Sequence, residues 1–455
     1  MIENLLSYLE NKKILLLGFG KEGESTYKFL RKHFPEKKLG IADSNMNLLE
    51  EKSFLFEDVN VEVMLGKDYF RDIDYYDIVI KTPGISLKDI DISKFRNKIT
   101  SQLELLLEYI PCFTIGITGT KGKSTTSTLM YQILKEQNKN VMLLGNIGEP
   151  IFNDIDDMTE DTILVLELSS HALEFVKKSP NIAILLDIYE EHLDHYSSLE
   201  KYIEAKFNVA KYQNNKDIFI YNASNQYIKN HKFTYKENDV AVIESGDLET
   251  QKDNCIRIKK DGIYFDNNKI CNEIGEMNLK GTHNLNNILF VIATSKLLNL
   301  DMEKTIDTIK NFKPLEHRME FVAEIDNVRY YNDSISTIPE ATINAIKALK
   351  DVNTVIVGGK DRGVDLEELC EFLEKCDVEN IICLPKTGEY IYSKLNSKKK
   401  CFMAMEMPAA VKIAKKVTVK DKICLLSPAA SSYGYFKNFE ERGKIFKNCI
   451  LQKNL

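Results

Sequence analysis

The sequence predicts an α/β protein of about three domains, each built around a mostly parallel sheet. Short apolar runs alternate with amphipathic stretches along the chain, which is the pattern of repeated strand–helix units. Several apolar runs end directly on glycine or polar residues, as expected at the carboxyl edge of a parallel sheet, where ligands bind. The length of 455 residues fits about three domains of ordinary size.

The first predicted domain, residues 1–95, has the element order of a Rossmann-like fold. An apolar strand at residues 14–17 runs into the turn Gly18-Phe19-Gly20-Lys21, a helix follows, and the next strand ends on Asp43. The glycines permit a tight turn, and the helix N-terminus behind them favours a pyrophosphate group. Read alone, this pattern is a dinucleotide-binding fingerprint and favours an NAD-dependent oxidoreductase. A further strand is expected at residues 77–81.

The second predicted domain, residues 96–313, contains a glycine-rich loop between a strand and a helix. The loop is Gly119-Thr120-Lys121-Gly122-Lys123-Ser124-Thr125. Its backbone amides and the following helix N-terminus can cradle phosphates, with Lys123 reaching the β and γ oxygens and Ser124 holding Mg²⁺. Ile117 stands where the usual motif has its first glycine, so a plain turn with an exposed lysine is the alternative interpretation. We expect a P-loop mononucleotide-binding domain with a mostly parallel sheet.

The third predicted domain, residues 314–455, is again Rossmann-like, because apolar strands alternate with helical segments in it.

The remaining elements of the second and third domains follow from the same alternation. A hairpin is expected around Asp261-Gly262, at the periphery of the second domain. One helical segment is expected from His283 to Phe312. Further strands are expected at residues 141–144, 163–166 and 182–186 in the second domain, and at 328–332, 354–357, 381–384 and 423–426 in the third.

Composition excludes several classes of protein. The chain has 61 Lys and Arg against 68 Asp and Glu, a net charge of −7, and no lysine-rich block, so nucleic acid is a poor partner. Nine cysteines without a repeated C-x-x-C spacing favour reduced thiols over disulfides or a zinc cluster. No run approaches the roughly 18 apolar residues that a membrane helix needs. We expect a cytoplasmic monomer without membrane insertion.

Motifs across the chain resemble those of the Mur ligase family in order and spacing. In the second domain they are the glycine-rich loop, Gly145-Asn146-Ile147-Gly148, Glu167-Leu168-Ser169-Ser170 and the segment 281–287. In the third they are the segments 315–318, 332–334, 358–363 and 427–432. The resemblance implies an ATP-dependent ligase that forms an amide bond through an acyl phosphate, in the synthesis of peptidoglycan precursors.

The resemblance also implies roles for single residues. Lys123, His192 and Lys206 would form the catalytic set, with Ser124 and Glu167 binding one Mg²⁺ and His192 and a carbamylated Lys206 binding a second. A solvated Glu167 and a surface Lys206 are the alternatives, and Lys201 is the nearest substitute for Lys206. The nucleotide would contact Asn287, Arg318 and Asp333 besides the loop, and the UDP end of the other substrate would contact Gly18, Phe19, Gly20, Lys21, Asp43 and Asn146.

The C-terminal segment 427–443 looks like that of the family members that add D-glutamate to UDP-N-acetylmuramoyl-L-alanine. The resemblance places Thr337 and Arg362 near one carboxylate of D-glutamate, and Ser432 and Phe439 near the other. Arg362 replaces a lysine that is frequent in the family and keeps its charge, whereas Ile335 replaces a lysine without doing so. Other Mur ligases and folylpolyglutamate synthetase are the alternative enzymes that the resemblance allows.

Overall fold

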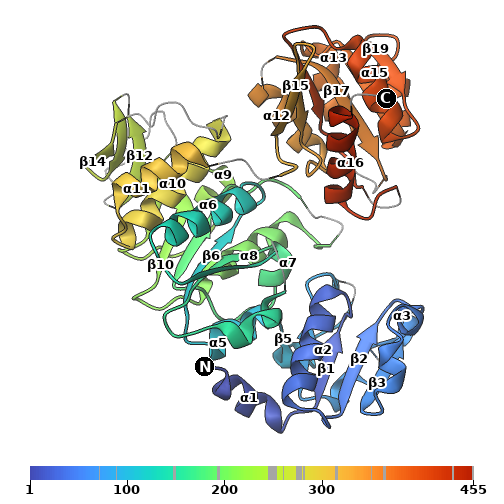
Figure 1. Cartoon of the computed structure of the whole chain (residues 1–455). Helices are drawn as coiled ribbons and strands as arrows, with labels where there is room; N and C mark the ends of the chain where they lie inside the picture. The colour runs from blue at the N-terminus through green and yellow to red at the C-terminus, as the bar shows by residue number, and fades with distance from the viewer. Residues whose placement is uncertain are drawn as a thin grey trace. The chain divides into compact units, whose positions relative to one another are not determined.

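The computed structural model separates the chain into two compact units. They comprise Met1–Glu276 with His283–Asn311, and Met277–Thr282 with Phe312–Leu455. Three sheets with helices against them confirm the predicted α/β class (Figure 1). Because two sheets share the first unit, the predicted three domains and their boundaries stay a prediction. The structure describes all residues except 71, 89, 147–149, 192–194, 244–253, 260, 273–278, 280–281, 313–315, 350, 362–364, 433–434 and 453–455, and the side chains of 68, 282, 283 and 340.

The first sheet is five-stranded and parallel, in the order β3-β2-β1-β4-β5. Its central strand β1 is buried along its whole length, which explains its unbroken apolar run. A Cβ on Gly23 would lie 2.2 Å from the carbonyl oxygen of Gly18, so helix α2 packs against the turn only because residue 23 is glycine. The strands are β1 Ile14–Leu17, β2 Leu39–Asp43, β3 Val61–Leu65, β4 Ile78–Lys81 and β5 Ile99–Thr100, with helices α1 Glu3–Glu10, α2 Lys21–His33, α3 Leu48–Glu51 and α4 Phe54–Glu57.

The central sheet has nine strands in the order β14-β13-β12-β11-β10-β9-β6-β8-β7. It is parallel from β7 to β12 and antiparallel from β12 to β14. The predicted hairpin is confirmed as β12 and β13, and it lies at one end of this sheet. The strands are β6 Phe113–Thr118, β7 Val141–Gly145, β8 Ile163–Glu167, β9 Ile182–Leu185, β10 Ile218–Asn222, β11 Val240–Ile243, β12 Cys255–Lys259, β13 Gly262–Phe265 and β14 Asn268–Cys271.

The single helical segment expected from His283 to Phe312 is wrong, because two helices occupy it. Asn299 has a positive φ of 51°, which ends the first helix. The side chain of Asp301 then accepts hydrogen bonds from the backbone N–H groups of Glu303 and Lys304, which caps the second. The helices of this part are α5 Gln102–Tyr109, α6 Lys123–Glu136, α7 Ser170–Leu173, α8 Leu199–Lys211, α9 Gln226–Asn230, α10 Thr282–Leu297 and α11 Met302–Asn311.

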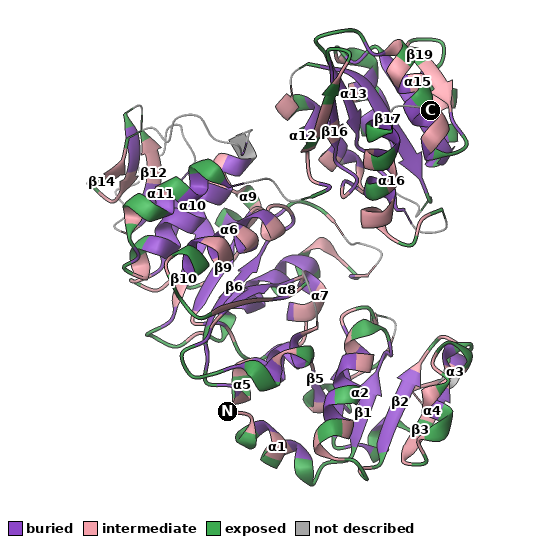
Figure 2. Cartoon of the chain, in the orientation of Figure 1, coloured by how far each residue is buried: buried purple, intermediate pink, exposed green. Residues whose placement is uncertain are grey.

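One hydrophobic core continues from the first sheet into the central sheet. Phe29 of α2 packs on Phe152, with ring centroids 4.6 Å apart. Figure 2 shows central strands such as β1, β6 and β17 buried, and exposed faces on the surrounding helices. Within the described part of the chain, no helix is both long and apolar enough to cross a membrane.

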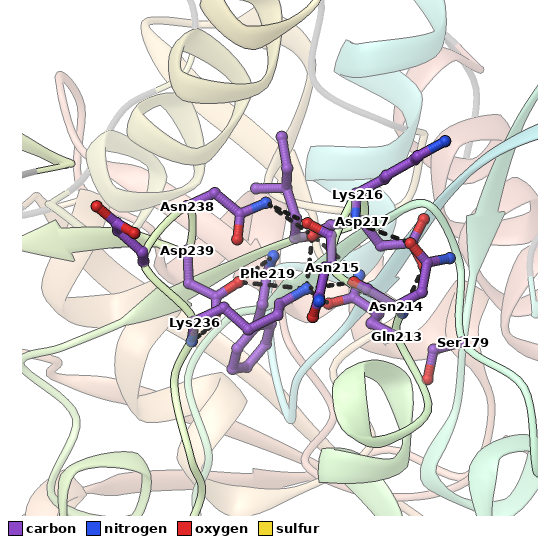
Figure 3. A network of polar contacts seen from close by, with 12 residues as sticks. Ser179, Gln213, Asn214, Asn215, Lys216, Asp217, Phe219, Lys236, Asn238 and Asp239 are labelled. Atoms are coloured by element: carbon purple, nitrogen blue, oxygen red, sulfur yellow. Dashed lines mark hydrogen bonds and ion pairs between the residues drawn. The ribbon is translucent and has the colours of Figure 1, made fainter.

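A polar network joins the connection between helix α8 and strand β10 to the segment that precedes strand β11 (Figure 3). The ammonium of Lys236 donates to the side chain of Gln213 at 3.3 Å and to the carbonyl oxygen of Asp217 at 2.5 Å. The carboxylate of Asp239 accepts the backbone N–H of Phe219 at 3.0 Å and of Lys236 at 2.7 Å. These bonds fix the end of the helix that carries Lys206.

The sheet of the second unit has the order β15-β16-β20-β17-β18-β19 and is parallel except for the pair β15–β16. Alternate residues of β20 enter different cores, Leu425 on one face and Leu426 on the other. Both faces are therefore covered, and the strand reads as one apolar run. The elements are β15 Glu320–Ile325, β16 Val328–Asn332, α12 Pro339–Leu349, β17 Val352–Gly359, α13 Glu367–Lys375, β18 Asn380–Lys386, α14 Thr387–Leu395, β19 Lys400–Met403, α15 Met407–Val417, β20 Ile423–Leu426 and α16 Phe439–Leu451.

Replacing Asp239 by alanine should destabilise the first unit, because the buried backbone N–H of Phe219 and the partly buried N–H of Lys236 lose their acceptor. Each buried donor left without a partner costs about 1 to 3 kcal/mol. Urea unfolding followed by circular dichroism measures the effect. The matched control is Asp261→Ala, since the bonds that the described residues make to this exposed carboxylate come from the side chains of Tyr264 and Lys269. Equal stability of the two variants would contradict the structural role of the network.

Candidate functional site

The glycine-rich loop connects the buried strand β6 to helix α6. Lys123 begins α6, and its ammonium donates to the carbonyl oxygens of Gly119 at 3.0 Å and Thr120 at 3.1 Å. The lysine therefore folds over the loop, which differs from a plain turn with an exposed lysine. Gly122 has a positive φ of 84°, and a Cβ there would lie 2.3 Å from the side-chain oxygen of Asn287. Helix α10 thus brings Asn287, a residue predicted to bind the nucleotide, against the loop.

Lys206 reaches the same loop from helix α8. Its ammonium donates to the carbonyl oxygen of Gly119 at 2.8 Å, and its side chain is buried. Burial, and after it the Lys123 cation, hold the pKa of Lys206 well below its usual value. Lys201, the substitute considered from the sequence, is exposed and pairs with Glu204 at 2.9 Å. Lys206 is therefore the lysine of this helix that faces the phosphate loop.

Glu167 ends strand β8, which pairs with β6 so that Glu167 lies opposite Ile117. The carboxylate is buried, and one oxygen accepts a hydrogen bond from the side-chain amide of Asn146 at 3.1 Å. Among the described residues, its Oε2 atom has no hydrogen-bond partner. A buried carboxylate oxygen without a donor fits a hard cation such as Mg²⁺. A solvated glutamate does not describe this position.

The metal site as a whole is not complete among the described residues. No group of three or more His, Cys, Asp or Glu side chains with metal-binding spacing occurs within them. His192, the predicted partner of Lys206, lies outside the described residues, and so does Asp194 beside it. The contribution of His192 to a second metal site therefore stays a prediction.

The turn after β1 is shaped by Asp43. Its carboxylate accepts the backbone N–H of Phe19 at 2.7 Å and of Asn45 at 2.8 Å. Gly18 has a positive φ of 91°, while Gly20 and Lys21 are exposed where helix α2 begins. Asp43 thus holds the turn that a pyrophosphate would approach, and its predicted contact with the substrate stays a prediction.

A cavity lies between the carboxyl edge of the first sheet and that of the central sheet, both within the first unit. Asn146 and Glu167 line one side of it, and Glu22 and Lys81 line another. Sequence reasoning missed Glu22 and Lys81 as site residues. The available signal was a charged residue closing the apolar strand Ile78–Lys81. The cavity is also lined by Pro83, Thr100, Ser101, Leu103, Gly145, Pro150, Ile151, Leu168, Ser169, His171, Ala172 and Phe175.

In the second unit, Asp333 is buried at the end of β16. It accepts hydrogen bonds from the hydroxyl of Ser427 at 2.7 Å and from the backbone N–H of Met319 at 3.2 Å. Burial raises the pKa of Asp333 to about 6, although these bonds and the Arg318 cation act in the opposite direction. The Nε atom of Arg318 is buried and has no hydrogen-bond partner within the described part of the chain. A guanidinium with an unpartnered Nε is suited to bind an anionic group.

Arg442 joins the loops on which the other predicted residues lie. Its fully buried guanidinium donates to the side chain and carbonyl oxygen of Ser334 at 3.0 and 2.7 Å, and to the carbonyl oxygen of Ala430 at 2.9 Å. The hydroxyl of Ser334 in turn donates to the carbonyl oxygen of Phe439. Arg442 had no predicted role, although it lies in the quoted motif. Of the residues predicted to bind D-glutamate, Ser432 is buried, Phe439 begins α16, Thr337 is partly buried, and Arg362 lies outside the described residues.

Comparison with known proteins matches two family models to the chain. Residues 117–295 match the Mur ligase middle domain, and residues 317–430 match the Mur ligase, glutamate ligase domain. The UDP-N-acetylmuramoylalanine–D-glutamate ligase of Clostridium kluyveri is 31% identical over 98% of both chains. The chain belongs to the Mur ligase family. Membership of the Mur ligase family replaces the interpretation as an NAD-dependent oxidoreductase.

Further Mur ligases are also similar to this chain. The UDP-N-acetylmuramoylalanine–D-glutamate ligase of Clostridium botulinum is 33% identical over 97% of both chains. Among solved structures, the UDP-N-acetylmuramate-alanine ligase MurC of Thermotoga maritima matches with a TM-score of 0.58 and 18% identity, over 96% of this chain and 99% of that one. The MurF ligase of Thermotoga maritima in complex with ADP has a TM-score of 0.58 and 16% identity, over 91% and 95% of the two chains. The solved structures establish that the Mur ligase fold is shared.

Replacing Arg442 by methionine should destabilise the second unit, because the loops that follow β16 and β20 lose their shared donor. Each hydrogen bond that a charged donor gives to these oxygens is worth about 1.5 to 3 kcal/mol. Hydrogen exchange of the second unit and its thermal midpoint measure the effect. The control is Lys444→Met, because Lys444 lies on the same helix and is exposed. A midpoint unchanged by Arg442→Met would show that other contacts hold these loops.

Proposed function

We propose that this Mur ligase joins D-glutamate to UDP-N-acetylmuramoyl-L-alanine at the expense of ATP, in the synthesis of peptidoglycan precursors. The observation that carries the proposal is the phosphate loop with Lys123 folded over it and the unpartnered oxygen of Glu167 on the neighbouring strand. The two substrates are those named for the relatives that match nearly the whole chain. Another Mur ligase activity is the alternative.

The reaction needs activation of a carboxylate, because oxide is a poor leaving group. A carboxylate oxygen of the L-alanine residue attacks the γ-phosphorus of ATP, the bond to the β-phosphate oxygen breaks, and ADP leaves. The amine of D-glutamate then attacks the acyl carbon, phosphate leaves, and the nitrogen loses a proton. The loop amides, Lys123 and the N-terminus of α6 neutralise charge on the phosphoryl oxygens, which is the main contribution a protein makes to phosphoryl transfer.

The predicted Mg²⁺ ions have ligands of suitable chemistry among these residues. Ser124 and Glu167 would hold the first, and His192 with a carbamylated Lys206 would hold the second. Bound Mg²⁺ would offset negative charge on the phosphate oxygens. The buried Oε2 of Glu167 supports the first assignment.

Carbamylation of Lys206 is supported by its surroundings. The buried amine lies at the Gly119 carbonyl oxygen beside the Lys123 cation, and its lowered pKa favours the neutral form. Addition of CO₂ to the neutral nitrogen, with loss of one proton, gives an anionic carbamate. This change would turn a cation repelled by Lys123 into an oxygen ligand for a metal.

The second unit supplies the remaining binding residues of this proposal. Arg318, with its unpartnered Nε, would bind the γ-phosphate, and Asp333 would accept a ribose hydroxyl. Thr337 and Arg362 would bind one carboxylate of D-glutamate, and Ser432 and Phe439 the other. A dicarboxylate requires two such sites with donors of this kind.

We also infer a cytoplasmic site of action and a monomeric enzyme. All nine cysteines are free thiols, which suits a reducing compartment. Neither inference affects the chemistry.

The function is tested by phosphate release from ATP with UDP-N-acetylmuramoyl-L-alanine and a panel of amino acids. D-Glutamate should support release and a product of the summed mass, while L-glutamate, L-alanine, L-lysine and diaminopimelate should not. Lys123→Ala should lower the turnover with D-glutamate at least about 100-fold, since it removes a charge from the transferring phosphate. Faster release with another amino acid would overturn the assignment of D-glutamate.

Lys206→Ala should also lower turnover at least about 100-fold, because the second metal would lose an anionic ligand. Acetate should restore part of the activity by entering the space of the lost carbamate, and mass spectrometry at high bicarbonate should show the added CO₂ in the wild type. Lys201→Ala is the matched control, since Lys201 is exposed on the same helix. Full activity of Lys206→Ala would exclude the role.

A further inference from the structure

Lys81 is a buried cation that the steps described above do not use. Its side chain is 3% exposed, and among the described residues its ammonium donates one hydrogen bond, to the carbonyl oxygen of Thr82 at 3.2 Å. An ammonium group has three N–H donors. No carboxylate of the described residues lies within ion-pair distance of it, and the ring of Phe175 is 5.4 Å away. A buried charge so sparsely bonded is costly unless a ligand completes its contacts.

Glu22 faces the same cavity from the first turn of helix α2. Among the described residues its carboxylate accepts no hydrogen bond, and it is partly buried. Burial raises the pKa of Glu22 to about 7 against the effect of Lys81, and burial lowers the pKa of Lys81 to about 8 against the effects of Glu174 and Glu22. Two opposite charges thus share the cavity without forming an ion pair, and their charges nearly cancel within it.

The remainder of the lining indicates which part of a substrate fits here. The same cavity contains the carboxylate of Glu167, and its lining includes apolar side chains such as those of Leu103 and Phe175. Without a metal ion to neutralise them, the carboxylates of Glu22 and Glu167 would repel a phosphate group in this space. An uncharged segment with amide and acyl oxygens meets donors without that repulsion.

We propose that Lys81 is a specificity-determining residue that donates hydrogen bonds to the acyl and amide oxygens of the muramoyl-L-alanine part of the substrate, with Glu22 cancelling its charge. This inference rests on the proposed function, because it names the residue that reads the substrate between its UDP end and the reacting carboxylate. The two residues therefore have different roles. Lys81 donates hydrogen bonds to the ligand, whereas Glu22 donates none, and in a purely structural ion pair neither residue would contact the ligand.

Lys81→Met should therefore raise the KM for UDP-N-acetylmuramoyl-L-alanine about 10- to 100-fold, the equivalent of one charged hydrogen bond. The KM values for ATP and D-glutamate should stay at the wild-type level. Glu22→Gln should leave the KM for the UDP compound unchanged or lower it, because the ammonium then has no competing carboxylate. Lys28→Met is the control, since Lys28 lies on helix α2, is exposed and pairs with Glu24.

The affinity for UDP alone separates contact with the acyl part from contact with the diphosphate. Isothermal calorimetry should give the same Kd for UDP with the wild type and Lys81→Met. Weaker UDP binding would overturn the proposal in favour of a phosphate contact. An unchanged KM in Lys81→Met, or an equal rise in Glu22→Gln, would also overturn it.

A second variant keeps the test decisive where Lys81→Met does not fold, as judged by circular dichroism. Lys81→Arg keeps the charge and the donors, so its affinity for the UDP compound should be close to that of the wild type. A loss of that affinity in folded Lys81→Arg would count against the proposal. Failure of the proposed function is distinguishable, because the wild type itself would then release no phosphate with the UDP compound and D-glutamate.

Discussion

Two ammonium groups share one acceptor, the carbonyl oxygen of Gly119, and the described part of the site is arranged around this contact. Lys123 reaches it from the start of α6 and Lys206 from the middle of α8. Burial, and after it repulsion by the Lys123 cation on the same neutral oxygen, lowers the pKa of Lys206. The loop therefore holds an excess of positive charge that anionic phosphates, or a carbamate, would offset. Without the buried strands that bring these helices together, neither lysine would lie there.

The local sequence predicted the position of those site residues that lie in one loop or at the end of one strand. The phosphate loop follows from glycines between a strand and a helix, and Glu167 follows from its place at a strand end, because parallel strands present their carboxyl ends at one edge. Lys206 needed the family resemblance, since its spacing alone left Lys201 open. For the loop and Glu167, the chain within a few residues of the side chain decides where it lies.

Residues whose position depends on distant segments were not predictable in this way. Arg442 donates a hydrogen bond to Ser334, which lies more than one hundred residues earlier in the sequence. Nothing in the sequence of its own helix marks Arg442 as buried. Glu22 and Lys81 line one cavity with Glu167 only because the first sheet packs beside the central sheet. The bond from the backbone N–H of Phe19 to the carboxylate of Asp43 also joins segments that are distant in sequence. The break between α10 and α11 depends on a left-handed Asn299, which periodicity does not reveal.

The unpartnered atoms of Glu167 and Arg318 have a consequence outside the reaction. A folded protein that buries such atoms gives up stability, and any ligand that completes their contacts restores it. Under the proposed function, the fraction of molecules that unfold, and so become open to proteases, would fall as nucleotide and metal become more abundant. The abundance of the enzyme in a growing cell would be coupled in this way to the energy supply that its reaction consumes.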